Sequence, residues 1–134
     1  MITVAVNINS SLEKVWEFWN NPIHIQNWYF ASPDWHCPSA ENDMKIGGKF
    51  NIRLEAKDAS FGFDFEGIYT EIINFQLIEY VLEDKRKVIT TFENSEDRVV
   101  VTQNFDPETE NSLELQQNGW QAILDNFKKC VEHN

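Results

Sequence analysis

Residues 111–129 read NSLELQQNGWQAILDNFKK and form the clearest element of the sequence. Apolar side chains recur along it and just beyond it at steps of three and four residues, which places them on one face of a helix. That face holds Leu115, Trp120, Ile123, Leu124, Phe127, Cys130 and Val131. Asn111 or Ser112 caps the helix, which continues to about Val131 and is roughly 30 Å long. Such a stripe must be covered, and a sheet is the only large partner that the remaining sequence offers.

The sequence before this helix predicts a sheet and two short helices. Residues 2–8 alternate between apolar and polar, which indicates a strand with one buried face. Ser10 or Ser11 then caps a helix that stops before Pro22, and Pro22 opens a second short helix. Later strands are joined mostly by short turns, so we expect a largely antiparallel sheet of about six or seven strands. Residues 29–45 are predicted to form an irregular loop, a candidate lid over a binding site.

The composition predicts one soluble domain spanning residues 1–134. The chain has 22 acidic and 11 basic residues, a formal charge of −11. Such a surface repels nucleic acid and anionic membranes, so neither is an expected partner. No segment has the roughly 18 apolar residues of a membrane-spanning helix, and no signal peptide is visible at the N-terminus. Two cysteines make no disulfide framework. A cytoplasmic location is the default expectation.

No catalytic or metal-binding pattern stands out. The three histidines are His24, His36 and His133, and none has metal-ligand spacing to a cysteine or another histidine. We therefore predict no metal, no cofactor and no catalytic residue. Asp64 and Glu66 share one face of a strand, opposite Phe63 and Phe65, so the two acids face solvent if the phenylalanines face inward. The reverse parity would place both acids inside and make an enzyme plausible.

Aromatic residues form the most informative group, at 13% of the chain. We expect three parts of the chain to converge on a ligand cavity: the first helical pair with its loop, the sheet, and the last helix. The candidate lining residues are Trp16, Trp19, Trp28, Phe30, Trp35, Phe50, Ile52, Phe63, Phe65, Tyr69, Trp120, Leu124 and Phe127. Candidate polar contacts are His24, Arg53 and Gln116, with Tyr69 as a further polar group. A solid core with no pocket is the alternative reading of the same residues.

The order of elements and four local motifs resemble a known family. Residues 64–72 (DFEGIYTEI), 78–84 (IEYVLED) and 101–106 (VTQNFD) are similar to strands of the helix-grip fold of the START-like, or SRPBCC, superfamily. Residues 111–129 resemble the terminal helix of its bacterial branch named after the activator of the heat-shock protein ninety ATPase. One departure is the turn at Asp84-Lys85-Arg86, which lacks the usual glycine after the aspartate.

The resemblance implies a curved sheet gripping the long helix, with a hydrophobic cavity between them. Superfamily members bind lipids, sterols, polyketides or flavonoid-like molecules, so the leading hypothesis is a binder of a small apolar or aromatic ligand. Two alternatives stay open: a co-chaperone-like module with a chaperone partner in the stress response, and a cyclase or dehydratase on the same fold. The chain is expected to be a monomer or a homodimer formed through an edge strand.

Overall fold

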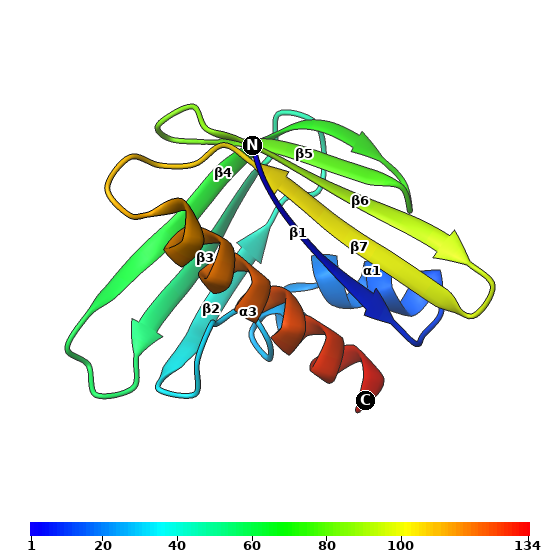
Figure 1. Ribbon diagram of the computed structural model, residues 1–134, viewed down its shortest axis with the longest axis horizontal. Helices are drawn as coiled ribbons and strands as arrows, with labels where there is room; N and C mark the ends of the chain where they lie inside the picture. Colours follow the sequence, from blue (N-terminus) through cyan, green and yellow to red (C-terminus); the bar gives the residue numbers. More distant parts are fainter.

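The seven strands form one curled antiparallel sheet in the computed structural model, which describes residues 1–134 (Figure 1). They are β1 (Ile2–Ile8), β2 (Trp35–Asn42), β3 (Lys49–Ala56), β4 (Gly62–Ile73), β5 (Leu77–Leu82), β6 (Lys87–Ser95) and β7 (Arg98–Phe105). Their order in the sheet is β1-β7-β6-β5-β4-β3-β2. Strands β2 to β7 follow one another as hairpins, while β1 pairs with β7 because the chain leaves β1 through two helices. The predicted fold class is confirmed.

Three helices accompany the sheet, as predicted. They are α1 (Leu12–Asn20), α2 (Pro22–Ile25) and α3 (Leu113–Glu132). The hydroxyl of Ser11 caps α1 by accepting a hydrogen bond from the Lys14 amide at 3.2 Å. The hydroxyl of Ser112 caps α3 by accepting from the Leu115 amide at 3.1 Å. No helix is long and apolar enough to cross a membrane.

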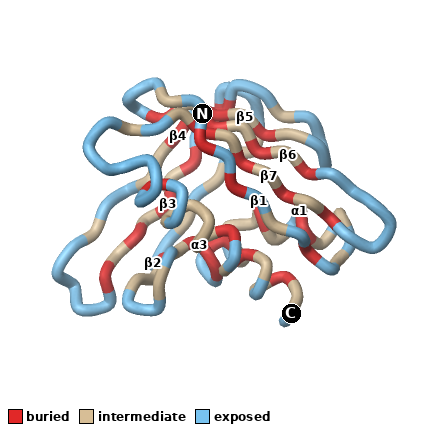
Figure 2. The backbone as a smooth tube through the Cα atoms, viewed as in Figure 1, coloured by how far each residue is buried: buried red, intermediate tan, exposed pale blue.

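Buried and exposed residues alternate along the strands, so the sheet has one core face (Figure 2). In β3, Phe50, Ile52 and Leu54 are buried and the residues between them are only partly buried. The core face also carries Phe65 and Tyr69 of β4, while Asp64 is exposed on the convex face. Phe65 therefore faces the core and the two acids lie on the opposite face of β4, while Phe63 shares the side of Phe65 but is itself exposed near the end of the strand.

Helix α3 lies across the hollow side of the sheet and closes its β1 edge (Figure 1). The Gln121 side chain bonds both backbone groups of Ala5, accepting from its N–H at 3.4 Å and donating to its C=O at 2.9 Å. Gln117 donates to the Thr3 carbonyl at 3.2 Å. These polar contacts take the place of a neighbouring strand, so the backbone of β1 is not left open along this edge.

Strand β2 corrects the prediction of an irregular loop over residues 29–45. Residues 35–42 pair with β3, and only the flanking parts are irregular. The register shifts between His36 and Ser39, where Pro38 has no N–H to donate. This bulge disrupts the alternation of apolar and polar residues by which a strand is recognised in sequence. Glu41 and Asn42 of this strand line a cavity of the protein.

Candidate functional site

A small cavity lies between the core face of the sheet and the pair α1–α2. Its volume is about 30 Å³, which is room for roughly two water molecules. The lining residues are Trp19, Ile25, Trp28, Tyr29, Glu41, Asn42, Phe50, Ile52, Tyr69, Ile78 and Tyr80. They come from α1, α2, the segment after α2, and β2 to β5. No residue of α3 is among them, so this cavity is not the expected one between the sheet and the last helix.

Aromatic rings form most of the cavity wall. Phe50 of β3 and Tyr80 of β5 meet edge to face with ring centroids 4.7 Å apart, and the Phe50 and Tyr69 centroids are 5.4 Å apart. Across the cavity, Trp19 and Trp28 have centroids 5.0 Å apart. Edge-to-face and tilted pairs of this kind are the favourable arrangements for aromatic rings. The result is a rigid wall suited to a flat or apolar molecule.

Gly67 permits this packing, because it lies opposite Phe50 in the pairing of β3 with β4. A Cβ atom built on Gly67 would lie 2.6 Å from the Cε1 atom of the Phe50 ring. Any other residue would therefore push the ring away from the sheet.

One end of the cavity is polar. The Tyr69 hydroxyl donates to the Asn42 Oδ1 atom at 2.5 Å, and the Asn42 Nδ2 atom donates to the Asn20 carbonyl at 2.8 Å. These bonds connect β4, β2 and the end of α1 across the cavity end. Glu41 is the only charged residue of the lining. The cavity therefore combines an aromatic body with a polar end that carries no positive charge.

The three tyrosines of the lining stay protonated at neutral pH. Burial raises the pKa of Tyr29 above its ordinary value, and a hydrogen bond with Tyr80 opposes part of this rise. Burial likewise raises the pKa of Tyr69, opposed in part by its bond with Asn42, and the pKa of Tyr80. Their hydroxyls are therefore neutral hydrogen-bonding groups rather than phenolates.

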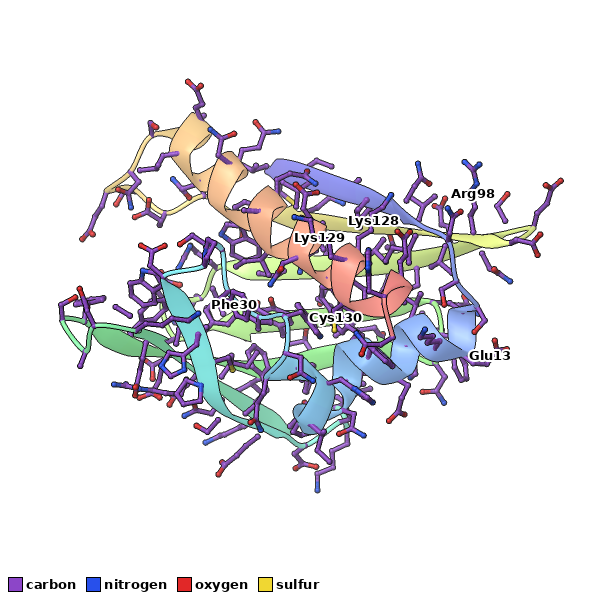
Figure 3. All side chains as sticks on the ribbon, turned by 90° about the horizontal axis from the view of Figure 1, so that it is seen from below. Glu13, Phe30, Arg98, Lys128, Lys129 and Cys130 are labelled. Atoms are coloured by element: carbon purple, nitrogen blue, oxygen red, sulfur yellow. The ribbon has the colours of Figure 1, made fainter.

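Only part of the predicted aromatic set lines this cavity. Trp19, Trp28, Phe50, Ile52 and Tyr69 do so. The predicted residues that lie elsewhere are Trp16, Phe30, Trp35, Phe63, Phe65, Trp120, Leu124 and Phe127. Figure 3 shows Phe30 in the connection that follows α2.

Several of these residues pack as core instead. Leu124 and Phe127 of α3 are completely buried, and the Phe127 ring meets the Trp28 ring with centroids 4.6 Å apart. The Trp120 ring stacks on Phe105 at 3.9 Å. These contacts fill the space beneath α3, where the cavity was expected.

Two predicted residues lie in an exposed aromatic cluster. Trp35 contacts Phe61 and Phe63, with centroids 6.0 Å apart in both pairs. Phe61 and Phe63 are 62% and 41% exposed. Trp16 of α1 packs against the buried Phe92 of β6 on the core face, with ring centroids 5.0 Å apart.

The predicted polar contacts also lie elsewhere. His24 stacks on Phe18 with centroids 3.9 Å apart. Arg53 lies on the convex face and pairs with Glu55 at 2.9 Å and Asp64 at 3.5 Å. Gln116 donates to the Glu108 and Asn111 carbonyls and so braces the start of α3. Each of the three has a structural partner outside the cavity.

Six lining residues were not predicted: Ile25, Tyr29, Glu41, Asn42, Ile78 and Tyr80. Ile78 and Tyr80 alternate on β5, and this parity was a usable signal for them. Glu41 and Asn42 had no such signal, because the bulged strand β2 that carries them was not recognised.

Side chains suited to metal binding or nucleophilic catalysis are not grouped at the cavity. No group of three or more His, Cys, Asp or Glu side chains is placed to hold a metal ion. Cys37 is buried and donates to the Ser39 carbonyl at 3.3 Å. Burial raises the pKa of the Cys37 thiol to about 11, which keeps it in the unreactive protonated form.

A second, larger hollow of about 410 Å³ lies over β2 to β5. Ile68 and Val81 are paired neighbours in it, and Ile68 is 41% exposed. The carboxylates of Glu66 and Glu83 and the ammonium group of Lys49 belong to residues of the same hollow. The hollow is therefore a partly apolar surface with an acidic border.

A family model matches almost the whole chain. The model described as "Activator of Hsp90 ATPase homolog 1-like protein" matches residues 9–132. A comparison with curated proteins gives no match.

Solved structures of similar proteins have the same fold. An AHSA1-like protein from Aeromonas hydrophila is 38% identical with a TM-score of 0.90, and the match covers 98% of this chain and 93% of that one. Chr148 from Cytophaga hutchinsonii is 49% identical with a TM-score of 0.85, and the match covers 99% and 92%. Protein NE0264 from Nitrosomonas europaea is 12% identical with a TM-score of 0.80, covering 98% and 95%, and so shows likeness of fold alone.

Proposed function

We propose that this chain, which belongs to the family of activator of Hsp90 ATPase homolog 1-like proteins, binds a small apolar or aromatic molecule. The fold of the family is the helix-grip fold of START-like proteins. The site is the cavity between the sheet and α1–α2. The observation that carries this proposal is the wall of Trp, Tyr and Phe rings around a polar end. Such a combination gives affinity through apolar contact and orientation through one or two hydrogen bonds.

The ligand must widen this cavity, because about 30 Å³ is too small for one aromatic ring. A cavity that binds benzene has a volume of about 150 Å³. The wall most easily displaced is α2, which is a single turn of four residues packed against α1 and β2. Irregular segments flank this part of the wall, between α2 and β2 and between β2 and β3. We therefore expect binding to be coupled to an outward shift of α2.

Tryptophan fluorescence tests the proposal, because Trp19 and Trp28 line the cavity. The protein is titrated with flavonoids, sterols and fatty acids, with correction for inner-filter absorption. Saturable quenching or a blue shift by one class is the expected result, and amide chemical shifts should change around the cavity. Absence of a saturable response to every class contradicts the proposal.

A pair of variants locates the site. Ile78→Ala enlarges the cavity and should tighten binding several-fold, since less displacement is then needed. Leu124→Ala removes a similar buried side chain beneath α3, outside the cavity lining, and should leave the affinity close to that of the wild type. Equal effects of the two substitutions would place the ligand elsewhere.

A protein-interaction role of co-chaperone type is the second candidate, and the hollow over β2 to β5 favours it. Its apolar part with Ile68 and its acidic border with Glu66 and Glu83 suit a basic segment of a partner. A pull-down with a chaperone of the heat-shock protein ninety class, at low and high salt, tests this role. The double variant Glu66→Lys/Glu83→Lys should abolish capture, and failure to capture the chaperone at low salt would count against it.

The enzyme alternative has less support. It needs a charged or histidine side chain inside the cavity, placed for proton transfer, and inward placement of Glu66 or His24 would favour it. Glu41 is the one charged residue of the lining, and it is exposed to solvent. Glu66 instead accepts a hydrogen bond from the Asn51 Nδ2 atom at 2.6 Å on the convex face, and His24 is stacked on Phe18.

A further inference from the structure

The polar end of the cavity holds more free hydrogen-bond acceptors than free donors. The Tyr69 proton is engaged by the Asn42 Oδ1 atom at 2.5 Å, so the Tyr69 oxygen has only lone pairs left to offer. One Asn42 amide proton is engaged by the Asn20 carbonyl at 2.8 Å, and the second amide proton is the one donor that the Tyr69 and Asn42 side chains leave free. Asn42 Oδ1 keeps one further acceptor position. A ligand group that contacts Tyr69 and Asn42 therefore meets more acceptor positions than donors.

The charges of the lining residues also favour a hydrogen-bond donor over an anion. Glu41 is the only charged residue there, and the lining contains no Lys, Arg or His. The whole chain carries a formal charge of −11. A carboxylate buried here would lose its water and gain no cation in return, which is strongly unfavourable.

From this geometry we infer that the ligand carries a hydrogen-bond-donating head group, a hydroxyl or an ammonium, on an aromatic or apolar body. The head group donates to the Tyr69 hydroxyl oxygen and to Asn42 Oδ1. Molecules with a carboxylate head, including fatty acids, are rejected. This inference rests on the proposed function, because it names the ligand class of the same cavity.

A series of ligands with one shared body tests the head group. The probes are phenethyl alcohol, phenethylamine, propylbenzene and hydrocinnamate, each titrated against the full-length protein. The alcohol and the amine should bind about tenfold more tightly than propylbenzene, the effect of one good hydrogen bond. Hydrocinnamate should bind more weakly than propylbenzene.

Substitutions at the polar end test the assignment to Tyr69 and Asn42. Tyr69→Phe should remove the advantage of the alcohol over propylbenzene while leaving propylbenzene affinity nearly unchanged. Asn42→Ala frees the Tyr69 proton, so benzyl methyl ketone should gain several-fold relative to propylbenzene. The control is Thr90→Val, which loses a buried hydroxyl outside the cavity lining and should preserve the wild-type order of affinities. Circular dichroism checks that each variant is folded.

The outcomes separate this inference from the proposed function. If propylbenzene binds as tightly as the alcohol and the amine, or if hydrocinnamate binds most tightly, the inference is wrong and the apolar cavity stands. If no probe binds, including propylbenzene, the proposed function fails and the inference fails with it. Persistence of the alcohol's advantage in Tyr69→Phe also overturns the assignment.

Discussion

At the residue scale, Gly67 lies in a crowded environment and Gly119 in an open one. A Cβ atom on Gly67 would meet the Phe50 ring at 2.6 Å, while one on Gly119 meets nothing within 4 Å. The first glycine therefore serves packing at the candidate site, while the second only lowers the stability of the α3 interior.

Gly67→Ala should lower the free energy of unfolding by about 1–3 kcal/mol, because the Phe50 ring must move within a packed wall. Gly119→Ala should raise it by about 0.5–1 kcal/mol through the better helix propensity of alanine. Urea denaturation of the two variants measures both changes. Destabilisation by both substitutions would show that the space around Gly119 is needed.

Lys85 occupies the position where the family pattern has glycine, and its φ is 69°. A residue with a Cβ atom is strained by about 1–2 kcal/mol in this left-handed region. Glycine removes this strain but loses more backbone entropy on folding, so Lys85→Gly should raise the free energy of unfolding by about 0.5–1 kcal/mol. Thermal unfolding measures the change. Lys87→Gly, in the strand that follows, should instead destabilise, and a loss of stability in Lys85→Gly would refute the argument.

At the scale of elements, α3 acts both as a core helix and as a cover for β1. Its apolar face buries Leu124, Phe127 and Val131, while Gln117 and Gln121 bond the free backbone of β1. At the opposite edge, β2 is interrupted by its bulge and by Pro38. Both edges are therefore protected against unwanted strand pairing, by different means.

Removal of the Gln121 amide tests the role of α3 at this edge. Gln121→Ala should lower the free energy of unfolding by about 0.5–1.5 kcal/mol through loss of its bonds to Ala5. Hydrogen exchange at the Ala5 amide should accelerate. Asn118→Ala, at an exposed position on the same helix, is the control: it should leave hydrogen exchange at Ala5 unchanged and raise the free energy of unfolding by about 0.5 kcal/mol through helix propensity. An unchanged exchange rate at Ala5 in Gln121→Ala would mean that the glutamine does not protect the edge.

At the scale of the whole molecule, three buried tyrosines make the stability of the fold depend on pH in alkali. Burial raises the folded-state pKa of Tyr29, Tyr69 and Tyr80 above the value in the unfolded chain. The stability that comes from keeping them neutral is fully present below a pH of about 10, the pKa of an unfolded tyrosine. It declines as the pH rises further towards the folded-state values, because the unfolded chain then loses protons that the folded chain retains.

The protein should therefore unfold in alkali above a pH of about 10, with the appearance of tyrosinate coinciding with loss of the folded circular dichroism spectrum. Tyr80→Phe removes one of these groups, so its stability should fall less steeply with pH over the same range. Early titration of all three tyrosines in the folded protein would show that the cavity is open to solvent.

Much of the fold was predictable because helix and strand periodicity are local properties of a sequence. The spacing of apolar residues in 111–131 predicted α3, and alternation predicted β1 and a largely antiparallel sheet of about six or seven strands. The same alternation placed Phe63 and Phe65 on one face of β4 and Asp64 and Glu66 on the other, and the pairing with β3 puts Phe65 on the core face. Strand β2 escaped detection because its bulge breaks the period of two on which the prediction depends.

The candidate site was predictable only in part. Local periodicity in the sequence selected the helices and most of the strands, whose apolar faces must meet in one core. The helix-grip architecture followed from the resemblance of residues 64–72, 78–84, 101–106 and 111–129 to START-like proteins. Which aromatic rings surround empty space became clear only from the packing of the folded chain. Trp19, Phe50 and Tyr69 line the cavity, whereas Phe127 and Trp120 fill the region under α3. That division depends on the curl of the sheet and on where β2 and α1–α2 close over it, and these distances between remote segments leave no periodic trace in the sequence.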